Sequence, residues 1–298
     1  MGTKSKIVLI SGPTASGKSE FAIKLAKKFN GEIINADSMQ VYKQLKFLTA
    51  RPNKKNQKKI RHHLYGYIDT NKRYSTGRWL KDAIKKIREI KKKDKIPILV
   101  GGTGLYFYSL INGLVKIPKI PLKIRNEIRF LQKNDGQQKF YKKLIKLDPN
   151  VKNRIDSNDI QRSIRAFEIK TYTKVSMYDW INKTKPIFKE EDFIKYYINF
   201  ERKDLIKRIE KRTSQMIKSG AIKEVRLFKK LKVKNDHSIN KVIGLNELKS
   251  YLDNKITLQT VKELIIIKTR QYAKRQSTWA RGKMSLWIKL NPYNLNLK

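Results

Sequence analysis

The chain has 298 residues, and its 70 Lys and Arg against 25 Asp and Glu give a formal net charge of +45. A charge this positive points first to a partner rich in phosphate. A hydrophobic fraction of 39% is enough to build a core and argues against disorder. The absence of cysteine excludes disulfides, thiolate catalysis and Cys-ligated zinc. No apolar run has the length of a membrane span or a signal peptide, so a cytoplasmic protein is expected.

The positive charge is spread along the chain. Residues 1–120 carry +20, residues 121–195 carry +8 and residues 196–298 carry +17. Lysine supplies 53 of the 70 basic residues, a bias that overall composition can produce without selection for binding. The total charge therefore does not locate a binding face.

The first third of the chain alternates strands and helices. Short apolar runs at 7–10, 32–36 and 96–100 predict buried parallel strands, and apolar residues at helical spacing predict helices over 18–29 and 76–92. The helix over 18–29 ends at an Asn-Gly pair, which is typical of a left-handed stop. This order predicts an α/β fold with a parallel sheet and a ligand site at the carboxyl ends of its strands.

The pattern changes after residue 120. Residues 121–195 read as helices over 122–131, 140–147, 158–172 and 176–181, with no strand between them. A strand is predicted at 196–200, followed by helices over 204–219, 221–231 and 258–283. We therefore expect a core made of residues 1–120 and 196–298, interrupted by a mostly helical insertion at 121–195.

The sequence GPTASGKS at residues 12–19 matches the phosphate-binding loop G-x-x-x-x-G-K-[ST]. It lies between a predicted strand and a predicted helix, where the loop N–H groups and the helix dipole can hold phosphate oxygens. Lys18 is expected to reach the terminal phosphate, and the Ser19 hydroxyl to ligate Mg²⁺. The predicted phosphate-binding residues are Gly12, Pro13, Thr14, Ala15, Ser16, Gly17, Lys18 and Ser19.

Other features of nucleotide hydrolases are missing. The strand at 96–100 ends in Gly-Gly-Thr, whereas an ATPase or GTPase should place a magnesium-organising acid there. Asp37 is the acid that does stand at a strand end. It can assist a metal or accept a proton from a substrate beside the phosphate. Alternatively, it caps a short helix over residues 39–43.

Five motifs occur in order: GPTASGKS at 12–19, ADSMQVYK at 36–43, TARP at 49–52, VGGTGLYF at 100–107 and KRQSTWAR at 274–281. Together they closely resemble the bacterial tRNA dimethylallyltransferases, and they extend over nearly the whole chain. The resemblance implies a P-loop NTPase-like parallel sheet flanked by helices. It also implies transfer of the prenyl group of dimethylallyl diphosphate to the exocyclic amine of the adenosine immediately 3′ of the anticodon in tRNA.

The resemblance implies a role for each motif. The phosphate-binding loop cradles the diphosphate with Mg²⁺, although family members are often labelled ATP-binding, and Arg212 matches an arginine directed at that group. Asp37 matches the general base, and Thr103 matches a residue that contacts the same site. A solvated helix face is the alternative for Arg212, a helix cap for Thr103 and core packing for Trp279. The residues that match tRNA contacts are Asp37, Ser38, Met39, Gln40, Thr103, Arg125, Gln161, Arg162, Ser163, Ile164, Arg165, Lys241, Lys274, Arg275, Gln276, Trp279 and Arg281.

The sequence departs from the family pattern at a few positions. Lys241 stands where the family usually has arginine, which keeps the charge but loses the bidentate fork. Leu245 replaces an aromatic residue, and Phe47 and Leu48 precede the TARP motif in place of smaller residues. These changes bear on local RNA contacts more than on the reaction.

Two other functions are open on the sequence. A nucleotide or small-molecule kinase would use the same loop for ATP and an acid near Asp37 as its base. A non-catalytic nucleic-acid-binding protein would account for the charge but leave the loop and Asp37 unused. Prenyl transfer explains all these features, with the tRNA anticodon loop and dimethylallyl diphosphate as partners. Nothing in the sequence demands a dimer or a membrane, so a monomer is expected.

Overall fold

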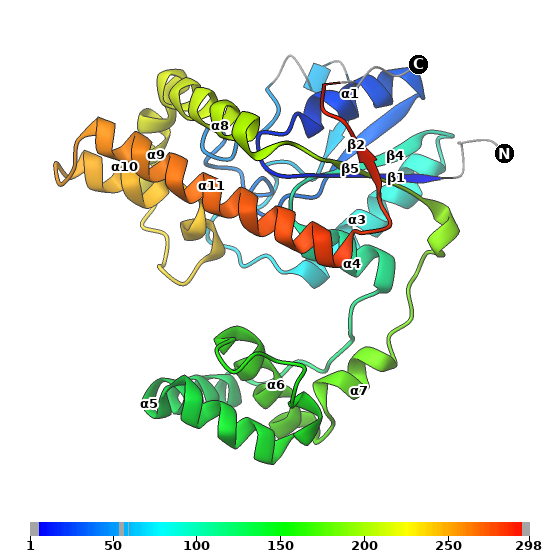
Figure 1. Ribbon diagram of the computed structural model, residues 1–298, viewed down its shortest axis with the longest axis vertical. Coiled ribbons are helices and arrows are strands. Elements are labelled where there is room, and N and C mark those ends of the chain that lie inside the picture. Colours follow the sequence, from blue (N-terminus) through cyan, green and yellow to red (C-terminus); the bar gives the residue numbers. More distant parts are fainter. Residues whose placement is uncertain (1–5, 54–56, 59, 294–298) are drawn as a thin grey trace. The chain divides into compact units, whose positions relative to one another are not determined.

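The computed structural model describes residues 6–53, 57–58 and 60–293, and the chain forms two compact units (Figure 1). Unit 1 comprises Met1–Ile111 and Phe188–Lys298, and unit 2 comprises Asn112–Ile187. Both ends of unit 2 precede the boundaries expected at 121 and 195. The C-terminal difference has a clear cause, because residues 193–195 belong to a strand of the sheet in unit 1.

Unit 1 is built on a six-stranded sheet with the order β3-β2-β4-β1-β5-β6. Every paired strand runs parallel to its neighbours. This confirms the α/β fold class. The strands are β1 (Ile7–Ser11), β2 (Gly31–Asn35), β3 (His62–His63), β4 (Ile96–Val100), β5 (Phe193–Ile198) and β6 (Ile288–Leu290).

The strands predicted from apolar runs are present, with β2 shifted by one residue and β5 shifted further. β5 begins at Phe193, three residues before the predicted strand at 196–200, because its register with β1 pairs Ile7 with Phe193 and Leu9 with Lys195. The two short edge strands β3 and β6 were not predicted. With two and three residues, they are too short to show a periodic pattern.

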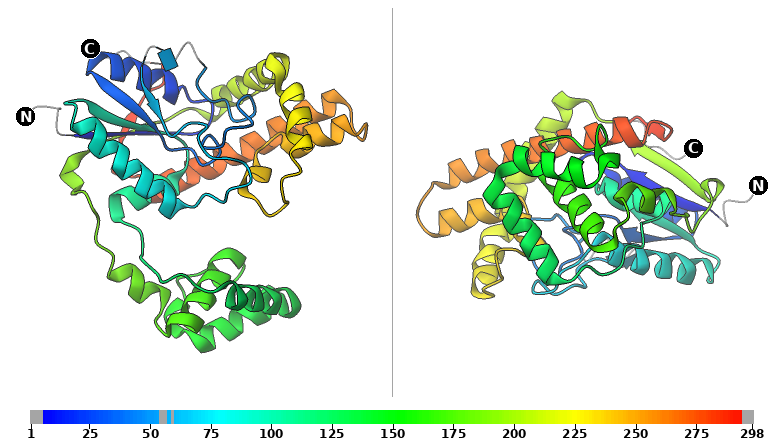
Figure 2. Two further views of the ribbon diagram at one scale, coloured as in Figure 1. Left: turned by 180° about the vertical axis from the view of Figure 1, so that it is seen from behind. Right: turned by 90° about the horizontal axis from the view of Figure 1, so that it is seen from below.

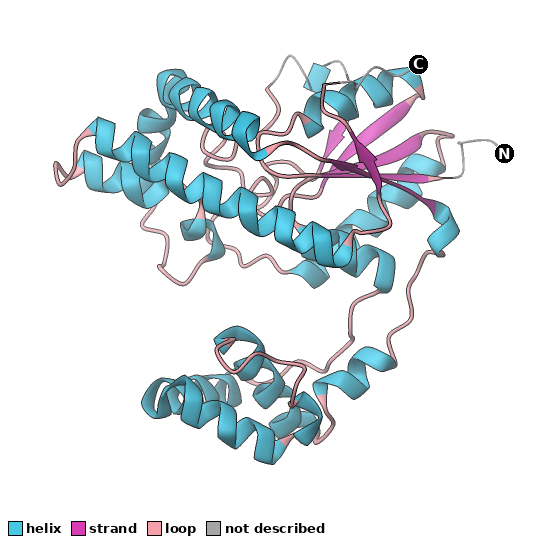
Figure 3. Ribbon diagram, in the orientation of Figure 1, coloured by secondary structure: helices cyan, strands magenta, loops and turns pink. Residues whose placement is uncertain are grey.

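Helices cover both faces of the sheet in unit 1, with α1 on one face and α3 and α4 on the other (Figures 1 and 2). A long helix, α11, packs along α8 (Figure 3). Among the described residues, none of the helices is long and apolar enough to cross a membrane. The helices of unit 1 are α1 (Lys18–Lys28), α3 (Thr76–Lys91), α4 (Gly104–Asn112), α8 (Arg202–Met216), α9 (Ile222–Lys230), α10 (Leu245–Leu252) and α11 (Leu258–Lys283).

The predicted helices over 204–219 and 221–231 correspond to α8 and α9, which are joined by a wide helical turn at Ile217–Ala221. Gly220 in this turn has φ 119°, a value that side chains disfavour, and the helix changes direction there. Helix α11 has the bounds predicted from its spacing. Helices α4 and α10 were not predicted as separate elements.

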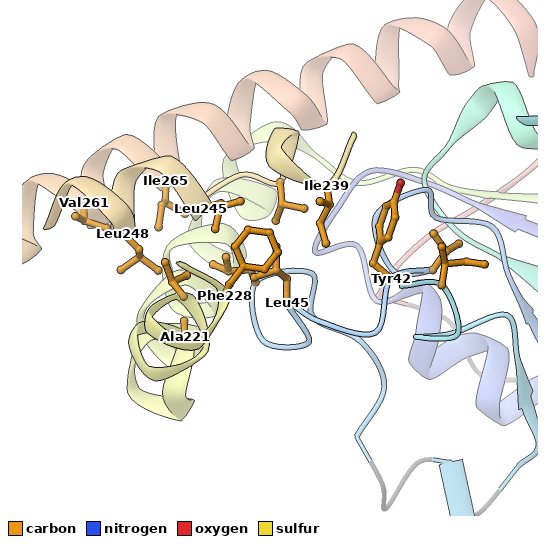
Figure 4. Packing of buried hydrophobic residues seen from close by; sticks show 14 residues of the cluster. Tyr42, Leu45, Ala221, Phe228, Ile239, Leu245, Leu248, Val261 and Ile265 are labelled. Atoms are coloured by element: carbon orange, nitrogen blue, oxygen red, sulfur yellow. The ribbon is translucent and has the colours of Figure 1, made fainter. Parts of the chain in front are cut away.

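One apolar cluster ties the C-terminal helices to the segment after β2 (Figure 4). Leu45 and Leu48 pack in it with side chains from α9, α10 and α11. Leu245, one of the departures from the family pattern, is 0% exposed within this cluster, so an apolar side chain suits its position. The buried members are Val41, Tyr42, Leu45, Leu48, Ile68, Ala221, Val225, Phe228, Ile239, Val242, Leu245, Leu248, Val261 and Ile265.

Unit 2 is helical and has its own small core. It contains α5 (Leu122–Leu147), α6 (Ile160–Thr173) and α7 (Met177–Asn182). The two helices predicted over 122–131 and 140–147 are parts of α5, which is kinked at Gly136, where φ is 71° and ψ is 164°. Buried Leu144, Val151, Ile155 and Ala166 form the core.

Candidate active site

Three loops that carry predicted site residues meet at one edge of the sheet. The phosphate-binding loop follows β1, Asp37 lies just past β2, and Gly101 to Thr103 follow β4. Because β2, β4 and β1 are parallel neighbours, their carboxyl ends converge. Gly101 lets the loops after β2 and β4 approach closely, since a Cβ atom there would lie 2.1 Å from the carbonyl oxygen of Ala36.

The phosphate-binding loop is held in shape by its own backbone and by α11. Gly17 has φ 87° and directly precedes the first residue of α1. From α11, the Gln276 side chain accepts a hydrogen bond from the Thr14 N–H at 2.8 Å and donates one to the Gly102 carbonyl at 2.9 Å. This carboxamide therefore joins the phosphate-binding loop to the loop after β4.

A polar cavity of about 180 Å³ lies over the phosphate-binding loop, and we call it the cationic cavity. Lys18, Arg208 and Arg212 line it together with the loop residues 14–19. The Ser16 hydroxyl is buried without a hydrogen-bond partner among the described residues. A buried polar atom without a partner is costly, so this hydroxyl is suited to a ligand oxygen.

Lys18 lies in the wall of this cavity, where burial changes its ionisation. Its Nζ donates to the Pro13 carbonyl oxygen at 2.6 Å. Burial lowers the pKa of Lys18 to about 7, the negative charge of Asp37 opposes this shift, and the positive charge of Arg212 adds to it. An anion in the cavity would favour the protonated form.

A second, more apolar cavity of about 300 Å³ adjoins the first, and we call it the apolar cavity. The two cavities share Thr14, Asp37, Thr49 and Arg212 in their walls. Asp37 and Arg212 therefore face both a place for phosphate and a place for an uncharged group. The apolar lining consists of Met39, Leu48, Met216, Val242, Ile243, Ile265 and Tyr272.

Asp37 lies in a turn and not at a helix start. Its Oδ1 accepts a hydrogen bond from the Met39 N–H at 2.9 Å, but no helix forms over residues 39–43, so the helix-cap interpretation is wrong. Thr103, just before α4, accepts a hydrogen bond from the Ser38 N–H at 3.0 Å and so fixes the turn that carries Asp37.

The two arginines of α8 reach the phosphate-binding loop, one turn apart. The Nη1 of Arg212 donates to the Thr14 hydroxyl at 2.8 Å, and the Nε of Arg208 donates to the Ala15 carbonyl at 2.7 Å. The arginine predicted to face the diphosphate, Arg212, therefore lies at the loop. The alternative of a solvated helix face does not describe this half-buried side chain.

The residues of the motif at 274–281 on α11 face different surroundings. Arg275 lines the apolar cavity and Gln276 the cationic one. Trp279 is half-buried and packs over Gly104, where a Cβ atom would lie 2.2 Å from the indole Nε1. The remaining predicted contacts from this motif, Lys274 and Arg281, are exposed and line neither cavity.

Predicted tRNA contacts outside this motif occupy varied positions. Met39 and Lys241 line the apolar cavity, and Gln40 lines the cationic one while donating to the Thr49 carbonyl at 2.8 Å. In unit 2, the segment 161–165 lies on α6. Ser163 is buried there and its hydroxyl accepts a hydrogen bond from the Gln137 side chain. Gln161 and Arg162 are exposed, and Ile164 is half-buried.

Some residues that line the cavities are not among the site residues that the sequence predicts. Thr49 lines both cavities, Tyr65 lines the cationic cavity and Tyr272 the apolar one. Burial raises the pKa of Tyr65 and of Tyr272, and the charge of Asp37 adds to both shifts. Helical spacing could have found Tyr272, because it lies four residues before Gln276 and so on the same side of α11.

We expect Gln276→Leu to loosen the phosphate-binding loop. The substitution leaves the Thr14 N–H and the Gly102 carbonyl without their partner, which should lower the free energy of unfolding by about 1–3 kcal/mol. The KM for the phosphate-bearing substrate should rise as well. Chemical denaturation and donor titration measure the two effects. Gln271→Leu, on an exposed position of the same helix, is the matched control, and equal behaviour of the two variants would refute the bridging role.

Comparison with known proteins agrees with this geometry. A family model described as "IPP transferase" matches residues 40–283. The chain is 64% identical over 99% of its length to the tRNA dimethylallyltransferase of Pelagibacter ubique (strain HTCC1062), covering 95% of that protein. It is 41% identical over 95% of its length to the tRNA dimethylallyltransferase of Rickettsia felis (strain ATCC VR-1525 / URRWXCal2), covering 92% of it.

Solved structures show the same relation. A eukaryotic dimethylallyltransferase acting on tRNA superposes with a TM-score of 0.85 at 30% identity, over 98% of this chain and 75% of that one. The tRNA isopentenylpyrophosphate transferase of Bacillus halodurans gives a TM-score of 0.69 at 31% identity, over 97% and 90% of the two chains. The family model, the near full-length identities and the shared fold show that the chain belongs to the tRNA dimethylallyltransferase family of enzymes.

Proposed function

We propose that this enzyme transfers the dimethylallyl group of dimethylallyl diphosphate to the exocyclic amine of the adenosine immediately 3′ of the anticodon in tRNA, and releases diphosphate. One observation carries the proposal: Asp37 and Arg212 stand in the wall shared by a cationic and an apolar cavity. A base and a cation are thereby placed where a diphosphate and an uncharged acceptor would meet.

The cationic cavity suits the diphosphate of the donor. The N–H groups of the phosphate-binding loop, the unpartnered Ser16 hydroxyl and the Lys18 ammonium are donors for its oxygens. Arg208 and Arg212 add positive charge from α8. Because charge builds on the diphosphate as the carbon–oxygen bond breaks, these groups stabilise the transition state more than the ground state.

The residues present also fit Mg²⁺. Ser19 is exposed in the wall of the cationic cavity, and its hydroxyl is a ligand type that Mg²⁺ accepts. Among the described residues there is no group of three or more His, Cys, Asp or Glu that could hold a metal, so an ion would also need the oxygens of the donor. A bound Mg²⁺ would supply further positive charge to the leaving diphosphate.

The apolar cavity suits the adenine and the prenyl chain. An adenine must leave its stack to be modified at the exocyclic amine, and a flipped base is held by apolar and aromatic side chains. Met39 and Tyr272 provide such surfaces beside Asp37. The polar rim, with Lys241 and Arg275, is positioned for the phosphates that flank the base.

The reaction then balances within this site. The amine nitrogen forms a bond to the allylic carbon, the bond from that carbon to the diphosphate oxygen breaks, and the diphosphate leaves with the electron pair. The amine proton passes to the Asp37 carboxylate, whose Oδ1 is oriented by the Met39 N–H. Thr103 and Ser38 keep this turn in place.

The net positive charge of the whole chain is suited to attracting RNA at long range. A net charge of +45 attracts a polyanion, and this attraction falls steeply with salt concentration. We propose that the anticodon loop is the part of tRNA that is bound, that the enzyme acts as a monomer, and that it works in the cytoplasm, where tRNA is processed.

The reaction is tested by incubating the purified protein with Mg²⁺, labelled dimethylallyl diphosphate and unmodified tRNA. We expect one added prenyl group, located by mass spectrometry on the adenosine 3′ of the anticodon, and tRNA with guanosine at that position should stay unmodified. Phosphorylation of a small molecule by ATP, with no tRNA product, would instead favour a kinase. The comparisons do not favour that alternative.

A further inference from the structure

Three arginines of unit 2 surround one buried glutamate. The side chain of Glu168, on α6, is 2% exposed. Its Oε1 lies 3.4 Å from the Nε of Arg125 and 3.8 Å from the Nε of Arg129, both on α5, and its Oε2 lies 3.1 Å from the Nη1 of Arg165. The three arginine side chains are 33%, 51% and 43% exposed, so they extend from the buried carboxylate into solvent.

This cluster contains more positive charge than its carboxylate requires. One well-placed arginine would neutralise a buried carboxylate, whereas three leave an excess of two positive charges in close proximity. Arg125 and Arg129 approach Glu168 through Nε, whereas Arg165 approaches it through Nη1. Guanidinium forks held in this way match the oxygens of a phosphate.

Helix α5 also carries exposed apolar side chains near these arginines in the sequence. Leu122 and Phe130 are each 66% exposed. Helical spacing places Leu122 on the face of Arg125, because residues three to four apart share a face, whereas Phe130 follows Arg129 directly and extends from a neighbouring face of the same helix. Unpaired RNA offers both phosphates and unstacked bases, and bases stack on aromatic side chains. The combination favours RNA over an acidic protein surface.

We propose that Glu168 is a positioning residue that holds Arg125, Arg129 and Arg165 as a preformed site for RNA phosphates, and that Arg129 is itself an RNA contact. The inference rests on the proposed function, since it takes tRNA as the partner. It adds two residues of unit 2, Glu168 and Arg129, to those that the sequence indicated. Glu168 acts only through the arginines it orients.

Glu168→Gln tests the positioning role because two physical effects have opposite signs. Removing a negative charge makes the protein more positive, so long-range attraction alone predicts tighter tRNA binding. Loss of positioning predicts weaker binding, by about tenfold when charge-assisted hydrogen bonds to phosphate are disturbed. Glu127→Gln is the matched control, since Glu127 is an exposed residue of α5 outside the cluster. We expect Glu127→Gln to bind with unchanged or slightly increased affinity.

Arg129→Gln tests the contact role without altering a buried group. The slope of log Kd against log salt should decrease by about 0.7–0.9, the value for one phosphate contact. Lys139→Gln removes the same charge from the same helix at a position 69% exposed, and its slope should match that of the unaltered protein. A purely structural effect would weaken binding without reducing this slope.

Binding is measured on the full chain by fluorescence anisotropy with unmodified tRNA at several salt concentrations, and circular dichroism monitors the fold. Tighter or unchanged binding by Glu168→Gln, or equal slopes for Arg129→Gln and Lys139→Gln, would overturn the proposal. If Glu168→Gln fails to fold, the Arg129→Gln slope decides alone. Binding needs no prenyl donor, so failure of the cluster and failure of the proposed reaction give different results.

Discussion

Asp37→Asn is expected to reduce the rate of prenyl transfer in single turnover by about 10²–10⁴-fold, the usual contribution of a positioned base. The asparagine oxygen can still accept the hydrogen bond that Oδ1 now accepts from the Met39 N–H, so the turn should persist. The amide cannot take the proton of the attacking amine. Rapid-quench measurements with saturating donor and tRNA report this step directly.

Affinity for tRNA should survive Asp37→Asn nearly unchanged, which separates chemistry from binding. Asp94→Asn is the control, because Asp94 is exposed in the turn between α3 and β4, at the opposite end of the strands. It should behave like the unaltered enzyme in both measurements. Weakened tRNA binding together with a normal single-turnover rate would show that Asp37 is a contact residue and not the base.

Lys18→Met should lower kcat/KM for dimethylallyl diphosphate by about 10²–10³-fold, as expected when a preorganised charge facing the leaving group is removed. Its affinity for tRNA alone should change little. Lys24→Met removes the same charge from the same helix, at a side chain 49% exposed. Lys24→Met should keep the kcat/KM of the unaltered enzyme for the donor, so only Lys18→Met should show the decrease. Similar kcat/KM values for the two variants would argue against the role of Lys18 in binding the diphosphate.

The pH dependence of donor use follows from the same residue. Burial lowers the pKa of Lys18 to about 7 in the free enzyme. Below this pH the ammonium is charged and attracts the diphosphate, whereas above it the neutral amine does not. Since kcat/KM reports the free enzyme, we expect kcat/KM for the donor to fall as the pH rises above about 7.

Bound diphosphate should shift this transition. The anion favours the protonated amine, so kcat at saturating donor should begin to fall only at a higher pH than kcat/KM. Lys18→Arg keeps its charge throughout this range, and its activity, even if lower, should lack the transition near pH 7. A transition retained in Lys18→Arg would have to come from another group.

Local patterns predicted much of unit 1. The apolar runs before residues 12 and 101 are buried strands, and α11 begins and ends where its spacing indicated. These elements depend on short-range preferences that a sequence displays directly. The short strands β3 and β6 escaped prediction because two or three residues form a strand only when a neighbour is already present.

The motif at 274–281 makes contacts that its sequence pattern does not predict. Its basic residues predict one RNA-binding group, but the structure places Arg275 at the apolar cavity and leaves Lys274 and Arg281 outside both cavities. The Gln276 side chain forms hydrogen bonds with the Thr14 N–H and the Gly102 carbonyl, and both residues are distant from it in the sequence. A helical pattern predicts which residues share a face, yet it does not predict which loop that face meets.

The sequence by itself determined the phosphate-binding loop, Asp37 at a strand end and the family, because these depend on residue type at short spacing. Tertiary structure decided that Asp37 and Arg212 share a wall between two cavities, and that Glu168 gathers arginines from two helices. Strand order and helix packing bring together residues that are distant in the sequence. The burial and the charges around such residues depend on these contacts, so a short sequence pattern does not predict them. Within a net charge of +45, the structure thus singles out a few basic side chains, those at the cationic cavity and around Glu168, that lie where they can bind a ligand.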